Sequence, residues 1–381
     1  MLVLSSSQFD PQETLSDHPT TSARATRNPV QNVLVLNLSG ALSAAEGADM
    51  KRREFITLIG GAAFAWPGAV LGQQPNQARR IGVLMQGSET EPDYRSYLAA
   101  FVQGLRQLGW IEGQNLRIDV RWSASDAKLA RAYSAELIGL MPDVILAATT
   151  LNLTMIHEAT STVPVVFVAV ADPVKQGFVA SIRQPGGNLT GFSLFEFSLG
   201  SKWIYLLKDV MPDLMRVAVM FNPDASPQAK FFMAVIEVEA PSLGVQVIPM
   251  PVRAFADIEP ALASFAGQPN NALILPPDPF LTLHISLIAD LVGRYRLPAI
   301  GSIPNFARYG GLMAYGNTVK LADQFRQAAT YVDRILKGSK PSDLPVQGAD
   351  IYGLIINLKT AKALGITVPL VVSGQADEVI E

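Results

Sequence analysis

Residues 163–174 read VPVVFVAVADPV, an unbroken apolar run that ends in an Asp-Pro pair. A short apolar run rich in β-branched residues and bounded by turn residues is typical of a strand buried on both faces of a parallel sheet. The residues that follow, 176–182, are predicted to form a helix. A buried strand followed at once by a helix is the repeating unit of an α/β fold, in which helices cover both faces of the sheet.

The same alternation of strand and helix extends in both directions from this stretch. Predicted strands lie at 81–85, 116–122, 144–148, 165–170, 217–221, 245–249, 272–275, 299–300, 311–315 and 352–356. Predicted helices lie at 94–108, 126–140, 151–159, 176–182, 199–210, 227–240, 258–265, 280–295, 322–336 and 358–364. Two successive strand–helix sets of similar size predict two doubly wound, Rossmann-like lobes.

The C-terminal part of the chain predicts how these lobes are connected. Strands and helices continue after the second set is complete, so the chain is expected to cross between lobes three times and form a hinge. The crossings are expected near 191–198, 305–315 and 343–349. The first lobe is then 79–193 with about 314–344, and the second is 196–312 with about 350–381.

Composition excludes several classes of function. The chain has 381 residues, 30 basic and 33 acidic, and a net charge of −3, which provides no basic footprint for nucleic acid. It has no cysteine, so thiol catalysis, thiolate metal sites and disulfides are excluded. It has three histidines and no phosphate-binding glycine loop or nucleophile elbow. We therefore predict no catalytic residue, no metal and no cofactor.

The N-terminal region carries a predicted export signal at 50–72. Lys51, Arg52 and Arg53 precede an apolar run, and Val70 and Gly72 occupy the −3 and −1 positions before Gln73. This arrangement is typical of a cleavable signal peptide, and the arginine pair resembles a twin-arginine signal. The apolar run is too short for a membrane span. Residues 1–49 are interpreted as an extension upstream of the true start at Met50, or as a disordered segment.

Ligands of open parallel sheets bind at the carboxyl ends of the strands, and several polar residues are predicted there. They are Ser88, Thr149, Thr150, Asp172, Asn222, Asp278 and Ser302. Helix N-termini beside them would suit a carboxylate, and Asp172 or Asp278 could accept from an ammonium. Prolines flank Asp278 and would remove backbone donors near it, so we expect Asp278 to contact the ligand and Asp172 to cap a helix. The alternative is that all these residues only form caps and turns.

Six segments together resemble ABC-transporter substrate-binding proteins, the family that includes tryptophan- and tyrosine-binding lipoproteins. They are residues 163–174, 185–191, 328–338, 343–346, 356–365 and 376–381. The resemblance covers 79–381 and implies a type I periplasmic-binding-protein fold that closes on a small ligand. It implies ligand contacts at Ser88, Thr149, Thr150, Asp172, Asn222, Asp278 and Asn317. Residues 147–150 read AATT where the family has Thr-x-Gly-Thr.

The predicted function is that of a non-enzymatic, monomeric solute receptor in the periplasm, free of a lipid anchor because no cysteine follows the signal. The expected ligand is an amino acid with an aromatic or branched side chain, and the expected partner is an ABC permease with its ATPase. Candidates for an apolar wall are Tyr94, Phe192, Phe195, Trp203 and Tyr315. Two alternatives remain open. One is a receptor for a membrane signalling protein, and the other is an exported enzyme, for which no nucleophile or metal set is evident.

Overall fold

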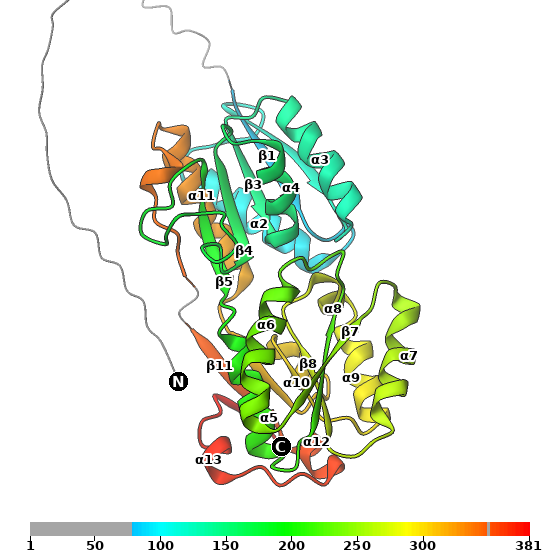
Figure 1. Cartoon of the computed structure of the whole chain (residues 1–381). Coiled ribbons are helices and arrows are strands. Elements are labelled where there is room, and N and C mark those ends of the chain that lie inside the picture. The colour runs from blue at the N-terminus through cyan, green and yellow to red at the C-terminus, as the bar shows by residue number, and fades with distance from the viewer. Residues whose placement is uncertain (1–77, 349–350) are drawn as a thin grey trace, which may run out of the picture. The chain divides into compact units, whose positions relative to one another are not determined.

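The run at 163–174 forms β4 (Val165–Ala171), an inner strand of a five-stranded parallel sheet with the order β2-β1-β3-β4-β5. The computed structural model describes residues 78–348 and 351–381 (Figure 1). The predicted signal and the upstream residues lie outside the described residues. The other strands of this sheet are β1 (Arg79–Met85), β2 (Leu116–Trp122), β3 (Val144–Ala148) and β5 (Leu189–Phe195).

Helices cover both faces of the first sheet because its strands are apolar on both sides. The helices are α2 (Pro92–Gln107), α3 (Ala127–Gly139), α4 (Thr149–Ala159) and α11 (Leu321–Leu336). Helices α2 and α11 pack with Val83 and Met85 through Phe101 and Phe325. Helices α3 and α4 pack against the opposite face, where Leu84 lies. The predicted cap of α3 is confirmed, because the Asp126 carboxylate accepts from the backbone N–H groups of the first turn.

The second sheet has seven strands in the order β12-β11-β10-β9-β8-β6-β7. They are β6 (Arg216–Phe221), β7 (Gln246–Pro251), β8 (Asn271–Leu275), β9 (Ala299–Gly301), β10 (Met313–Asn317), β11 (Tyr352–Asn357) and β12 (Glu378–Ile380). Neighbouring strands are parallel except β10 and β11, which are antiparallel. This arrangement confirms the α/β fold with two sheets.

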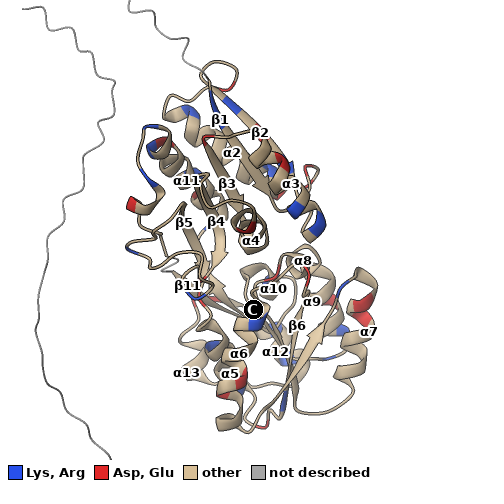
Figure 2. Ribbon diagram, turned by 45° about the horizontal axis from the view of Figure 1, so that its top comes forward, with Lys and Arg blue, Asp and Glu red and all other residues tan. Residues whose placement is uncertain are grey.

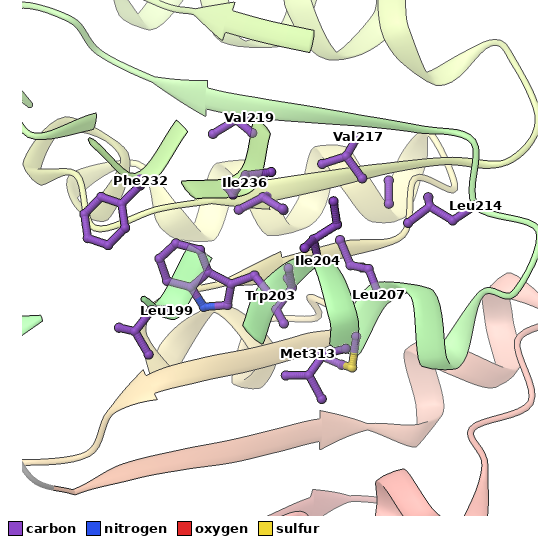
Figure 3. Packing of buried hydrophobic residues seen from close by; sticks show 14 of the residues in the cluster. Leu199, Trp203, Ile204, Leu207, Leu214, Val217, Val219, Phe232, Ile236 and Met313 are labelled. Carbon is purple, nitrogen blue, oxygen red and sulfur yellow. The ribbon is translucent and has the colours of Figure 1, made fainter. Parts of the chain in front are cut away.

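Eight α-helices lie within the described part of this second half of the fold. They are α5 (Leu199–Val210), α6 (Ala229–Glu239), α7 (Phe255–Ala266), α8 (Pro279–Leu283), α9 (Ile285–Arg294), α10 (Pro304–Arg308), α12 (Leu358–Leu364) and α13 (Leu370–Ser373). Trp203 of α5 is fully buried against Phe232 of α6 and the sheet (Figure 3). Helices α7 and α9 pack on the other face. Short 3₁₀ turns occur at Ala240–Leu243 and Pro341–Asp343.

The chain passes between the two sheets at three places. The first passage runs from Phe195 to Leu199, and the second from Asn317 to Leu321. The third passage runs from Gln347 to Tyr352, where β11 begins. Gln347 pairs with Phe192 of the first sheet. The expected middle crossing at 305–315 is wrong, because 304–308 form α10 and β10 pairs with β9 and β11 in the second sheet. We call 78–195 with 321–347 the first lobe, and 199–317 with 352–381 the second lobe.

Two of the predicted helices differ from the observed elements for local reasons. Residues 176–182 form turns and not a helix, because Gly177 has φ of +79°, a left-handed conformation that ends the first turn. The predicted helix at 280–295 is divided into α8 and α9, with His284 between them.

Charged side chains are interspersed over both lobes. Figure 2 shows short segments of Lys or Arg and of Asp or Glu scattered along a ribbon that is mostly neither. None of the described helices is long and apolar enough to cross a membrane.

Candidate functional site

A cavity of about 640 Å³ lies at the carboxyl ends of strands from both sheets. Gln86 after β1, Thr149 after β3 and Ala171 at the end of β4 line it from the first lobe. Asp278 after β8 and Ile303 after β9 line it from the second lobe. This is the position in which open parallel sheets bind ligands.

The first lobe presents the N-terminus of α4 to this cavity. The residue before the helix is Ala148, so no side chain caps the backbone N–H groups of the first turn. Thr149 lines the cavity, and its buried Oγ1 has no hydrogen-bond partner in the described part of the chain. Free N–H groups and the positive end of the helix dipole make such a terminus suitable for a carboxylate.

The backbone of Thr149 is in a strained conformation. Its φ is +77°, in the left-handed region that a β-branched residue rarely adopts. Ala169, which also lines the cavity, has φ of +57° at a register shift in β4. Strain of this kind persists where the surrounding structure maintains it, and it is concentrated at binding sites.

Hydrogen bonds of Thr150 and Gln324 maintain these two positions. Thr150 Oγ1 accepts from the N–H of Ala171 at 3.2 Å, which ties α4 to β4. Gln324 of α11 accepts from the N–H of Ala169 at 3.3 Å and donates to the carbonyl of Ser193 at 3.1 Å. These bonds connect α4 and α11 to the irregular end of β4 and, through Ser193, to β5.

Aromatic side chains form another wall of the cavity. Tyr94 and Tyr97 of α2 meet edge to face with ring centroids 5.9 Å apart, and Phe195 closes the end of β5. Gly87 allows this wall, because a Cβ there would lie 2.1 Å from the Tyr94 ring. Gln86 donates to the Tyr94 hydroxyl at 3.2 Å. Burial raises the pKa of Tyr94 well above its ordinary value, so this phenol stays protonated and can donate.

Asp278 has two structural hydrogen bonds in the second lobe. Its carboxylate accepts from the N–H of Leu281 at 3.1 Å, which caps α8, and from the N–H of Asn222 at 2.7 Å. The expectation that the flanking prolines leave Asp278 without backbone donors is therefore wrong. The donors come from the next helical turn and from the loop after β6. Burial raises the pKa of Asp278 to about 6, although these N–H groups oppose the shift.

The seven predicted site residues divide into two groups. Thr149, Thr150, Asp278 and Asn317 line the cavity. Ser88, Asp172 and Asn222 are not among its lining residues.

Each residue of the second group has a local role in its loop. The backbone N–H of Ser88 donates to the Glu91 carboxylate at 3.0 Å. The Asp172 carboxylate accepts from the N–H of Lys175 at 3.1 Å, as a cap of the turn does. Asn222 Oδ1 accepts from the N–H groups of Asp224 and Ala225 at 2.9 and 3.0 Å.

Asn317 lies where two chain passages meet. Its side chain donates to the carbonyl of Leu194 at 3.2 Å and accepts from the N–H of Val319 at 2.6 Å. Of the expected aromatic wall residues, Tyr94 and Phe195 line the cavity, whereas Phe192, Trp203 and Tyr315 do not.

Two buried glutamines that were not among the predicted ligand contacts, Gln86 and Gln228, also line the cavity. Each follows the carboxyl end of a strand by one to seven residues, so a wider reading of those loops could have found them. Among the described residues, no group of three or more His, Asp or Glu side chains could hold a metal ion.

The comparisons with known proteins identify the family. The family described as ABC transporter substrate binding protein matches residues 91–380. The chain belongs to this family. Its members bind small molecules for ABC transporters outside the cytoplasm, and the family therefore assigns the chain a binding role and not a catalytic one.

Individual members and solved structures agree with this assignment. A curated tyrosine-binding protein of Clostridioides difficile is 24% identical over 264 residues, which cover 69% of this chain and 75% of that protein. A conserved domain protein of Vibrio cholerae has a TM-score of 0.68 at 27% identity, over 79% of this chain and 99% of its own. An ABC domain of Streptococcus pneumoniae in complex with L-Trp has a TM-score of 0.66 at 24% identity, over 80% and 100%. The fold is that of type I periplasmic binding proteins, as predicted.

Proposed function

We propose that this substrate-binding protein is the receptor of an ABC importer for an aromatic amino acid. The ligand binds in the cavity between the ends of the two sheets and is delivered to a membrane permease with its ATPase. The receptor acts in the periplasm as a monomer and reaches it through the signal at 50–72. The observation that carries the proposal is an uncapped helix terminus and an aromatic wall lining one cavity.

The amino acid carboxylate binds at the start of α4. The first-turn N–H groups lack a side-chain cap, and the Thr149 hydroxyl has no partner among the described residues. A carboxylate provides acceptors for all of these groups and interacts favourably with the helix dipole. Thr150 contributes indirectly, because its hydroxyl already binds the N–H of Ala171 and positions the helix start.

The aromatic side chain of the ligand packs against Tyr94, Tyr97 and Phe195. Ring pairs in edge-to-face or offset geometry add favourable energy beyond the area they bury. The ligands that the relatives' names print, tyrosine and L-Trp, support an aromatic ligand over a branched one. The protonated Tyr94 hydroxyl is available to donate to a polar group of the ligand.

Binding is expected to favour a closed arrangement of the lobes. Residues of both lobes line the cavity, so a ligand gains its full set of contacts only when both contact it at once. The permease then recognises the liganded form. A receptor for a membrane signalling protein, the alternative function, would also close on its ligand, but a signalling protein would recognise the liganded form in place of the permease.

Isothermal titration of the chain from Gln73 onward with L-tryptophan, L-tyrosine, L-leucine and L-glutamate tests the proposal. We expect the aromatic amino acids to bind and to raise the melting temperature, because a ligand that binds only the folded state stabilises it. The radius of gyration should fall on saturation. Binding of L-glutamate or L-leucine in preference to both aromatic amino acids would contradict the proposed ligand class.

A further inference from the structure

Gln228 is a buried side chain of the second lobe with one unused hydrogen-bonding atom. It is the N-cap residue of α6, it lines the cavity, and it is 5% exposed. Its Oε1 is buried and has no partner within the described residues. A buried amide oxygen without a donor is costly, so such an atom in a cavity wall indicates a donor that binds there.

The hydrogen bond of the Gln228 nitrogen determines the orientation of the amide and therefore the position of its oxygen. Gln228 Nε2 donates to the carbonyl of Pro277 at 3.1 Å. Rotating the amide by 180° would place Oε1 against that carbonyl, and two acceptors repel each other. Ser226 Oγ also donates to the same carbonyl, at 3.3 Å, so the carbonyl is held in place from two sides. The Pro277 carbonyl thus engages the nitrogen of the amide, and Oε1 is the atom of this amide that has no partner within the described residues.

The neighbouring carboxylate already accepts two structural hydrogen bonds. Asp278 lines the same cavity, but its two oxygens accept from the N–H groups of Leu281 and Asn222. On the first lobe, the unpartnered Thr149 Oγ1 lies at the positive end of α4. The cavity thus has a free acceptor on one lobe, and donors that suit a carboxylate on the other.

We propose that Gln228 Oε1 is the specificity-determining acceptor of the second lobe and that it accepts a hydrogen bond from an N–H or O–H group of the ligand. This inference rests on the proposed function and deepens it. The ligand must carry a donor at some distance from its carboxylate, which is either its ammonium or a polar group of its ring. A neutral acceptor satisfies either donor without adding a second buried charge.

Titration of three related compounds against the chain and against Gln228→Met tests this role. Methionine preserves the length of the side chain and removes the acceptor. The compounds are L-tyrosine, L-phenylalanine, which lacks the ring hydroxyl, and 3-(4-hydroxyphenyl)propanoate, which lacks the ammonium. Ser226→Ala is the matched control, because it removes a donor to the Pro277 carbonyl and leaves Gln228 Oε1 intact.

We expect Gln228→Met to weaken L-tyrosine binding about tenfold or more, and Ser226→Ala to weaken it far less. The loss should disappear for the one analogue that lacks the donor, which identifies the ammonium or the hydroxyl as that group. An equal loss for all three compounds, or no loss at all, would overturn the role of Gln228. If the unmodified chain binds none of the three, the proposed ligand class fails first and this inference fails with it.

Discussion

The carboxylate of Asp278 accepts a hydrogen bond from the backbone N–H of Asn222 at 2.7 Å, and this contact joins the loop after β8 to the loop after β6. The same carboxylate caps α8 through the N–H of Leu281. One buried acid thus orders two loops at the end of the second sheet. Its role in the structure is to maintain the shape of the cavity wall.

Asp278→Asn is expected to lower the stability of the chain. An asparagine places an NH₂ group where one carboxylate oxygen accepts a backbone N–H, so one buried N–H loses its partner. The expected cost is about 1–3 kcal/mol. Urea unfolding followed by circular dichroism measures it. Asp224→Asn in the neighbouring exposed loop is the control, and an equal effect of both changes would contradict the assignment.

The stability of the chain should depend on pH because Asp278 is buried. The pKa of Asp278 rises from 3.8 to about 6 in the folded chain, so the folded state binds this proton more tightly than the unfolded state. The resulting stabilisation is complete below about pH 4 and is lost as the pH rises through 6. It amounts to roughly 3 kcal/mol. The free energy of unfolding of the parent minus that of Asp278→Asn should therefore decrease from pH 4 to pH 7, whereas a constant difference would refute the buried proton.

Thr149→Gly should separate strain from binding. Glycine adopts a φ of +77° without the steric cost that threonine incurs, about 1–2 kcal/mol, and this gain offsets the greater freedom of an unfolded glycine. The melting temperature is expected to stay level or rise, whereas aromatic amino acid binding should weaken about tenfold. Thr149→Ser retains the hydroxyl and should bind as the parent does. A marked fall in the melting temperature of Thr149→Gly would show that the backbone is not strained.

Asn317→Ala should destabilise the passage between the lobes. It removes the donor to the Leu194 carbonyl, which joins β10 to β5, and the acceptor for the Val319 N–H, which orders the start of the passage. The expected loss of unfolding free energy is about 1–3 kcal/mol. Asn305→Ala, at an exposed position of α10, is the control and should unfold as the parent does. If the parent, Asn317→Ala and Asn305→Ala all unfold at the same urea midpoint, the hydrogen bonds of Asn317 do not stabilise this passage.

The export signal predicts the N-terminus of the mature protein. Mass spectrometry of the periplasmic fraction should find a chain that begins near Gln73. Replacing both Arg52 and Arg53 by lysine should retain the precursor in the cytoplasm if export uses the twin-arginine route. A periplasmic chain that still begins at Met1 or Met50 would contradict the signal.

Local pattern was sufficient to predict most elements from the sequence. The apolar run of β4, the apolar periodicity of α2 and the Asp126 cap of α3 each depend on neighbours within a few residues. The family resemblance and the binding role also followed from contiguous motifs, and the family match confirms them. A local conflict explains the main error, because Gly177 ends a helix that the residues after it would otherwise favour.

Only the tertiary structure decided which polar groups are free to bind a ligand. The sequence placed Asp278 and Asp172 at strand ends, but not the N–H groups of Asn222 and Leu281 that engage Asp278. It offered no reason to single out Gln228, whose free oxygen is defined by the Pro277 carbonyl 49 positions away. The physical reason is that a hydrogen bond is made by groups close in space. The sequence therefore determined the elements and the family, and the packing of loops from distant strands determined the site.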